Sequence, residues 1–150
     1  MSASPELLRL LGWQDDPEPL HFLGEAGFLL LYLGRPKDAL TVFDGLAALV
    51  PNDPTPWLGQ GDALVEQGRL KPALESYQQA ARAERGDART LASCFRRQGE
   101  VQLRLRRAER ARPCFEQAVS IDPQGAEGQA AKELLSRLPP TRGKPQEHRS

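Results

Sequence analysis

Large and small apolar residues recur along the chain at a nearly fixed spacing. Between residues 54 and 87 the pattern holds Trp57, Gly61, Gly68, Ala73, Tyr77 and Ala80. Thirty-four residues earlier the same places hold Leu23, Gly27, Gly34, Ala39, Phe43 and Leu46. Thirty-eight residues later they hold Phe95, Gly99, Arg106, Ala111, Phe115 and Ala118. A period of this length indicates three stacked helix–turn–helix units, over residues 20–53, 54–87 and 92–125.

Each recurring position has a physical reason. The large residue opens the first helix and packs against its neighbour, and the glycine four residues later lets the second helix approach. Gly34 and Gly68 are expected to end helices in the left-handed conformation, so Arg106 at the same place predicts a third turn that is tighter or more strained. Pro113 should bend the third unit's second helix or delay its start. The four extra residues before the third unit predict an extended helix near Asp87–Leu91.

The segments outside the repeats complete the predicted organisation. Residues 1–19 are expected to form a short helix, which begins at Ser4-Pro5 and carries several leucines and Trp13, followed by an acidic linker. Residues 126–138 should form a helix that caps the last repeat, inside a helical pattern from Gln124 to Leu138. Its apolar side should hold Ala130, Leu134, Leu135 and Leu138. Residues 139–150 are expected to be a disordered tail.

This pattern resembles the tetratricopeptide repeat (TPR), a 34-residue helical hairpin, over roughly residues 20–125. The resemblance implies an all-α solenoid of three repeats, with an N-terminal helix and a C-terminal capping helix. In such solenoids the first helices of the hairpins line the concave face.

Composition and motifs favour binding over chemistry. His21 and His148 are the only histidines, and no metal-ligand spacing, phosphate loop or nucleophile motif is present, so we expect no enzyme activity, metal or cofactor. The longest apolar run, residues 28–33, is far shorter than the ~20 residues of a membrane span. The N-terminus lacks the basic start of a signal peptide, so we expect a cytoplasmic protein with no membrane insertion.

Charge is unevenly distributed although the formal net charge is zero. Residues 1–66 hold three basic and ten acidic residues, a net charge of −7, and the remainder carries +7. Seven arginines crowd the third unit: Arg96, Arg97, Arg104, Arg106, Arg107, Arg110 and Arg112. This run is either a solvated helix face or a basic patch for an acidic protein partner. Nucleic acid is disfavoured because Glu100 and Glu109 interrupt the run and aromatic side chains are few.

The predicted concave groove supplies the candidate binding site. Its expected residues are His21, Phe28, Leu31, Tyr32, Thr55, Leu58, Asp62, Val65, Arg96, Glu100 and Leu103. Their mixture suggests apolar anchors for a peptide segment of a partner, with Asp62 and Arg96 fixing its polarity. The alternative is that several of these residues only pack beneath the terminal helices. Some TPR proteins hold a C-terminal carboxylate with Lys and Asn, but the matching places here are Gly24, Phe28, Leu58 and Asp62.

A narrower resemblance concerns residues 37–43, with Leu46, followed by Trp57-Leu58-Gly59-Gln60-Gly61. This junction is similar to that of the small TPR chaperones of bacterial type III secretion systems. The resemblance implies a secreted translocator-type client gripped in the groove, with Phe28, Leu31, Tyr32, Leu58 and Asp62 as contacts. It also implies a homodimer through residues 5–13. Two other functions stay open: a generic TPR adaptor or scaffold in another bacterial complex, and a regulatory subunit of an enzyme.

Overall fold

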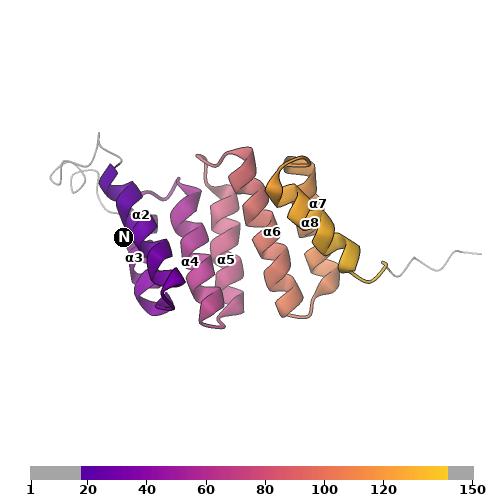
Figure 1. Ribbon diagram of the computed structural model, residues 1–150, viewed down its shortest axis with the longest axis horizontal. Coiled ribbons are helices and arrows are strands. Elements are labelled where there is room, and N and C mark those ends of the chain that lie inside the picture. The colour runs from indigo at the N-terminus through magenta and orange to yellow at the C-terminus, as the bar shows by residue number, and fades with distance from the viewer. Residues whose placement is uncertain (1–17, 142–150) are drawn as a thin grey trace, which may run out of the picture.

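A computed structural model describes residues 18–141 of the chain. Within this range seven α-helices follow one another without a strand (Figure 1). They are α2 (Glu18–Tyr32), α3 (Pro36–Leu49), α4 (Pro54–Glu66), α5 (Leu70–Arg82), α6 (Ala88–Arg104), α7 (Ala108–Ile121) and α8 (Ala126–Arg137). The helix predicted for residues 5–13 and most of the predicted tail lie outside the described residues. The all-α prediction is confirmed.

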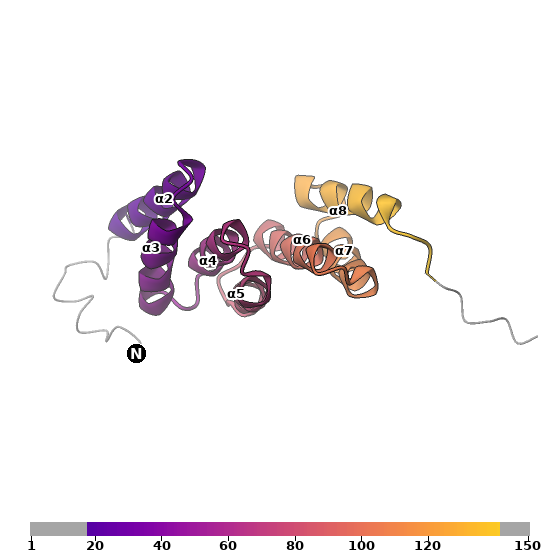
Figure 2. The same ribbon diagram turned by 90° about the horizontal axis from the view of Figure 1, so that it is seen from below.

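The helices form three sequential hairpins, α2–α3, α4–α5 and α6–α7, and each hairpin packs on the next. Figure 2 shows the first helices α2, α4 and α6 along one side, together with α8, and the second helices along the other. The helices α2 and α8 stand higher than α4 and α6 at the two ends of this row. The side formed by the first helices is therefore concave, with α4 and α6 as its floor.

Close approach of the two helices in each hairpin depends on the predicted glycines. A Cβ atom on Gly27 would lie 2.6 Å from the ring of Phe43, and one on Gly99 would lie 2.5 Å from that of Phe115. Gly61 stands in the same relation to Tyr77. Both phenylalanine rings are fully buried, and the tyrosine is nearly so. The recurring glycine and aromatic positions are thus two halves of one packing contact.

The three turns within the hairpins share one backbone conformation. Gly34 and Gly68 have φ angles of 71° and 73°, and Arg106 has a φ of 59°. The left-handed region is strained for a residue with a Cβ atom, so the prediction of a strained third turn is confirmed. Among residues 18–141, Arg106 is the only residue other than glycine with a positive φ.

The extra residues of the third unit lengthen its first helix, as predicted. The helix α6 has 17 residues, against 13 in α4, and begins after Asp87. The side chain of Asp87 accepts a hydrogen bond of 2.8 Å from the backbone N–H of Thr90, which caps the helix. Hydrogen bonding from Thr90, first by its side chain and then by its backbone N–H, lowers the pKa of the Asp87 carboxyl. The helix α7 begins at Ala108, well before Pro113, so the prediction of a late start is wrong.

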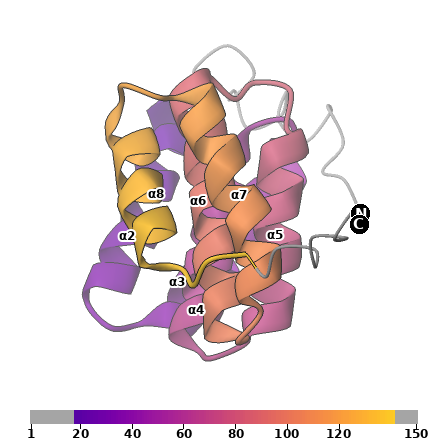
Figure 3. The same ribbon diagram turned by 90° about the vertical axis from the view of Figure 1, so that its right-hand side faces the viewer.

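The helix α8 covers the apolar end of the last repeat. It packs against α6 and α7 (Figure 3), and Leu134, Leu135 and Leu138 contact the cluster around Phe115. The buried residues of α8 are Gly128 and Ala131, whereas the predicted Ala130 is only half-buried. Ala131 stands three and four residues before Leu134 and Leu135, a spacing that places all three on one face of the helix. None of the described helices is long and apolar enough to cross a membrane.

Candidate functional site

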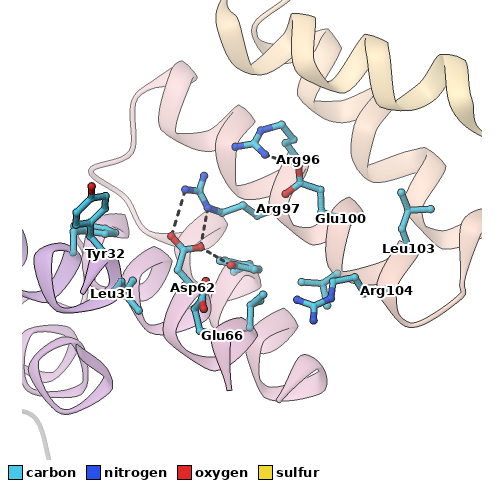
Figure 4. A pocket seen from close by; sticks show the side chains of 13 residues that line it. Leu31, Tyr32, Asp62, Glu66, Arg96, Arg97, Glu100, Leu103 and Arg104 are labelled. Atoms are coloured by element: carbon cyan, nitrogen blue, oxygen red, sulfur yellow. Dashed lines mark hydrogen bonds and ion pairs between the residues drawn. The ribbon is translucent and has the colours of Figure 1, made fainter. Parts of the chain in front are cut away.

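A hollow of about 750 Å³ opens between α2 and α6 on the concave side (Figure 4). One wall comes from α2, the floor comes mainly from α4, and the other wall comes from α6. Its lining consists of Phe28, Leu31, Tyr32, Asp62, Val65, Glu66, Tyr77, Arg96, Arg97, Glu100, Val101, Leu103 and Arg104. The hollow thus joins all three first helices of the solenoid in one surface.

The α2 wall is apolar and partly fixed in place. The ring of Phe28 packs edge-on against Phe43, with 4.9 Å between ring centroids, and leaves 36% of its surface exposed. Tyr32, one turn later on the same side of the helix, is 88% exposed. An apolar side chain that stands this far in water gains most from contact with a second apolar surface. The wall is therefore suited to hold an apolar side chain of a ligand.

The floor is organised around the carboxylate of Asp62. Its Oδ1 accepts a hydrogen bond of 2.5 Å from the Tyr77 hydroxyl on α5 and one of 3.0 Å from Nε of Arg97 on α6. Arg97 also donates to the hydroxyl of Ser93. These bonds tie α4, α5 and α6 together directly beneath the hollow. They connect the second repeat directly to the third.

The electrostatics of this network follow from partial burial. Burial, the charge of Asp62 and the hydrogen bond to it all raise the pKa of the Tyr77 hydroxyl, which stays neutral. Burial acts to lower the pKa of Arg97, but the charge of Asp62 and the hydrogen bond to it, with smaller contributions from Tyr77 and Glu127, together raise the pKa overall. Arg97 therefore remains a cation, and its charge is neutralised within the protein.

A second ion-pair group lies at the C-terminal edge of the hollow. Arg96 donates to Glu127 of α8 at 2.5 Å and to Glu100 at 2.6 Å. Burial acts to lower the pKa of Arg96, and the hydrogen bond to Glu127 with the charge of Glu100 raises it overall. The capping helix α8 is thus attached to the groove helix α6 by a charged bridge. Arg104 and Glu66, by contrast, form no ion pair among residues 18–141.

The structure brings eight of the eleven predicted groove residues to this hollow: Phe28, Leu31, Tyr32, Asp62, Val65, Arg96, Glu100 and Leu103. His21 and Thr55 instead line a neighbouring hollow of about 330 Å³, which shares Phe28. Leu58 is only 8% exposed and lies in the core around Tyr77, so it lines neither hollow. Its assignment to the groove surface is corrected, because α4 turns this position into the core.

Sequence reasoning missed five lining residues: Glu66, Tyr77, Arg97, Val101 and Arg104. Three of them, on α6, share the spacing of four and three residues that places side chains along one helical row. Glu66 stands four residues after Asp62. If the groove-facing side of α4 and α6 had been taken as a wider strip of each helix, it would have included Glu66 and the three α6 residues. Tyr77 sits at a core position of a second helix, and only its hydroxyl reaches the floor.

The arrangement offers contact surface and charged hydrogen bonds, which are the means of binding. Among residues 18–141 no group of histidine, cysteine, aspartate and glutamate side chains has the placement of a metal site. Burial raises the pKa of the Cys94 thiol to about 12, so this residue is a neutral part of the core. Cys114 is half-buried, and burial raises its pKa too.

Several solved structures have a similar fold. The type III secretion translocator chaperone SycD of Yersinia enterocolitica superposes with a TM-score of 0.74 at 21% identity, over 87% of this chain and 96% of that one. A second SycD structure, an alternative dimer, gives 0.70 at 21% identity, over 82% and 90%. PcrH in complex with the chaperone-binding region of PopB gives 0.68 at 23% identity, over 82% and 96%. The first TPR of Spaghetti, bound to an HSP90 peptide, gives 0.67 at 17%, over 81% and 93%.

Sequence comparison identifies the family. No curated protein matches the chain in sequence. Two family models, both described as tetratricopeptide repeat, match residues 25–88 and 97–124, which together are more than half of the chain. These ranges cover the second half of α2, the helices α3, α4 and α5, the second half of α6 and all of α7. The chain belongs to the tetratricopeptide-repeat family.

Proposed function

We propose that the hollow between α2 and α6 binds a peptide segment of a partner protein and that the chain performs no catalysis itself. The observation that carries this proposal is the pairing of an exposed apolar wall with a pre-arranged polar floor. Tyr32 stands in solvent beside Phe28, while Asp62 and Arg97 already satisfy one another. A bound segment would gain apolar contact without disrupting an ion pair.

The partner segment is expected to be apolar along one side. Side chains of Leu or Pro size would pack against Phe28, Leu31 and Tyr32, and burial of each would contribute about 1.5–3 kcal/mol before the entropy of ordering is subtracted. Glu66 and Arg104 lie on the lining without an ion pair among the described residues. Opposite charges on the ligand would pair with them and set its direction.

We further propose that the partner is a secreted translocator-type client and that the chain is its chaperone in the cytoplasm. The fold likeness to SycD and PcrH supports this choice, since PcrH is bound to a segment of PopB. The mode that grips a C-terminal carboxylate has no support here, because Asp62 occupies one of its positions and an ionised carboxylate has no hydrogen bond to donate to another. The alternative is a TPR adaptor that binds a folded member of another bacterial complex.

We also propose a homodimer in which residues 5–13 take part. Phe22 and Leu29 lie on α2 and are 69% and 56% exposed, and Leu33, in the turn directly after α2, is 59% exposed. Their spacing of seven and four residues gathers them in one stripe, about 100° around the helix from Phe28 and Tyr32. An exposed stripe of this kind at the end of a solenoid supports a partner surface there. It leaves the hollow open for a client.

Affinity capture from the source organism's lysate, read by mass spectrometry, tests the choice of partner. The chaperone proposal predicts one secreted, apolar protein, bound one-to-one and insoluble when expressed alone. Recovery of folded members of a cytosolic or envelope complex would overturn the chaperone proposal and establish the adaptor. Co-expression of the recovered protein with this chain, followed by measurement of its soluble fraction, separates a client from a folded partner.

A further inference from the structure

Four arginines surround a separate hollow at the turn between α6 and α7. This hollow of about 580 Å³ is lined by Arg106, Arg107, Arg110 and Arg112, and its opposite wall is Pro139-Pro140. Arg112 donates a hydrogen bond of 2.5 Å to the carbonyl oxygen of Pro139, which attaches the end of the chain's last described segment to α7. Four of the seven arginines in the sequence run therefore line one hollow.

The positive charge of this hollow is not neutralised within the described part of the chain. None of its four arginines takes part in an ion pair among residues 18–141, and Glu109 is the one acid on its lining. Arg96 and Arg97, on the same unit, are each paired with a carboxylate. Like charges held this close repel one another, so an anionic ligand would relieve an unfavourable arrangement.

The backbone at Arg106 supplies an independent observation. The first two repeats place Gly34 and Gly68 at this point of the turn, whereas the third places Arg106 at a φ of 59°. Glycine adopts this conformation without strain, and an arginine does not. A strained residue retained at a position that glycine fills elsewhere in the same chain points to a use for its side chain.

We propose that this hollow binds an acidic segment of a partner protein, through carboxylates that pair with Arg106, Arg107 and Arg110. The guanidinium group matches a carboxylate in geometry and can donate two parallel hydrogen bonds to it. A nucleic acid fits less well, because no aromatic side chain lines the hollow and residues 1–66 carry a net charge of −7. This surface is distinct from the hollow between α2 and α6 and goes beyond the proposed function.

The test uses the full chain and fluorescein-labelled hexaglutamate, read by fluorescence anisotropy at 50 mM salt. The expected result is saturable binding that weakens as salt screens the charges. Arg110→Glu should weaken binding about tenfold, and Arg106→Gly about three- to fivefold. Arg89→Glu is the control: it makes the same charge change on the exposed start of α6, about 22 Å along the helix from Arg104.

Arg106→Gly separates a binding role from a structural one. Because it relieves the strained turn, it should leave the melting temperature unchanged or raise it while the affinity for hexaglutamate falls. The proposal is overturned if hexaglutamate fails to bind at 50 mM salt, or if Arg110→Glu and Arg106→Gly bind it no more weakly than Arg89→Glu does. It is also overturned if a single-stranded DNA of equal charge binds more tightly than hexaglutamate, because the surface would then be one for nucleic acid.

Discussion

Arg97 on α6 donates its Nε–H to the carboxylate of Asp62 on α4 at a distance of 3.0 Å, although the two residues are 35 positions apart in the sequence. About a quarter of each side chain is exposed, so the pair is neither a surface ion pair nor a fully buried one. Its position beneath the groove makes it a link between the repeats as well as part of the lining. The stability of the solenoid and the shape of the groove therefore depend on the same pair.

We predict that Asp62→Asn lowers the free energy of unfolding by about 2 kcal/mol, because it leaves the half-buried guanidinium of Arg97 without its counter-charge. Urea unfolding followed by circular dichroism measures the change. Glu133→Gln is the matched control, since its ion pair with Arg137 is about two-thirds exposed and its loss should cost less than about 0.5 kcal/mol. Equal effects of the two substitutions would contradict the role given to Asp62.

A second prediction concerns the close contact between repeats one and two. A Cβ atom on Gly59 of α4 would overlap the ring of Phe43 on α3, which Gly27 flanks as well. Gly59→Ala should therefore destabilise the protein by about 1–3 kcal/mol. Gly45→Ala, at an exposed site in α3 with no neighbour near the added methyl group, should stabilise it by up to about 1 kcal/mol. Thermal unfolding of both variants should give shifts of opposite sign.

The buried thiol of Cys94 gives a prediction for alkaline pH. Its pKa is raised from 9.0 to about 12, so the folded state keeps a proton that the unfolded state loses. The resulting stability is complete below pH 9 and is lost progressively as the pH rises toward 12. Between pH 8 and 10 the free energy of unfolding should fall by about 1 kcal/mol more in the parent than in Cys94→Ala. Parallel curves for the two proteins would contradict the burial of this thiol.

The exposed stripe on α2 leads to a prediction about assembly. If residues 5–13 and the stripe form a homodimer, deletion of residues 1–17 should give a monomer in sedimentation equilibrium. Leu33→Glu should do the same, because it places a charge within the apolar contact. Ala48→Glu, an exposed position of α3 outside the stripe, should leave the dimer intact. An unchanged mass for the deletion and for Leu33→Glu would remove the proposed interface.

The repeat spacing predicted the fold because each recurring residue takes part in a contact or a turn within its own hairpin. Gly61 and Tyr77 can be paired from sequence alone, since a missing side chain and a large ring at a fixed separation describe one contact. Arg106 could be placed in a strained turn for the same reason: the register aligns it with Gly34 and Gly68. These features depend on neighbours within one hairpin.

The groove was less predictable because it depends on how each helix is rotated against the others. The spacing identified the side of α4 and α6 that faces the concave surface. It did not identify which residues at the margins of that side line the groove and which lie in the core. Leu58 was therefore placed on the surface although it lies in the core, and Arg97 was missed beside Arg96. The hydroxyl of Tyr77 reaches Asp62 only once α4, α5 and α6 have packed, and no local pattern records that meeting.

The most direct test of the groove is to compare partner capture by the parent, Tyr32→Glu and Ala48→Glu. Tyr32 is almost fully exposed on the α2 wall, so the substitution should preserve the helicity seen by circular dichroism while placing a charge in the proposed apolar contact. We predict that Tyr32→Glu loses at least about tenfold in affinity for the captured partner, measured by titration calorimetry, and that Ala48→Glu binds as the parent does. Undiminished binding by Tyr32→Glu would place the partner's contact elsewhere on the molecule.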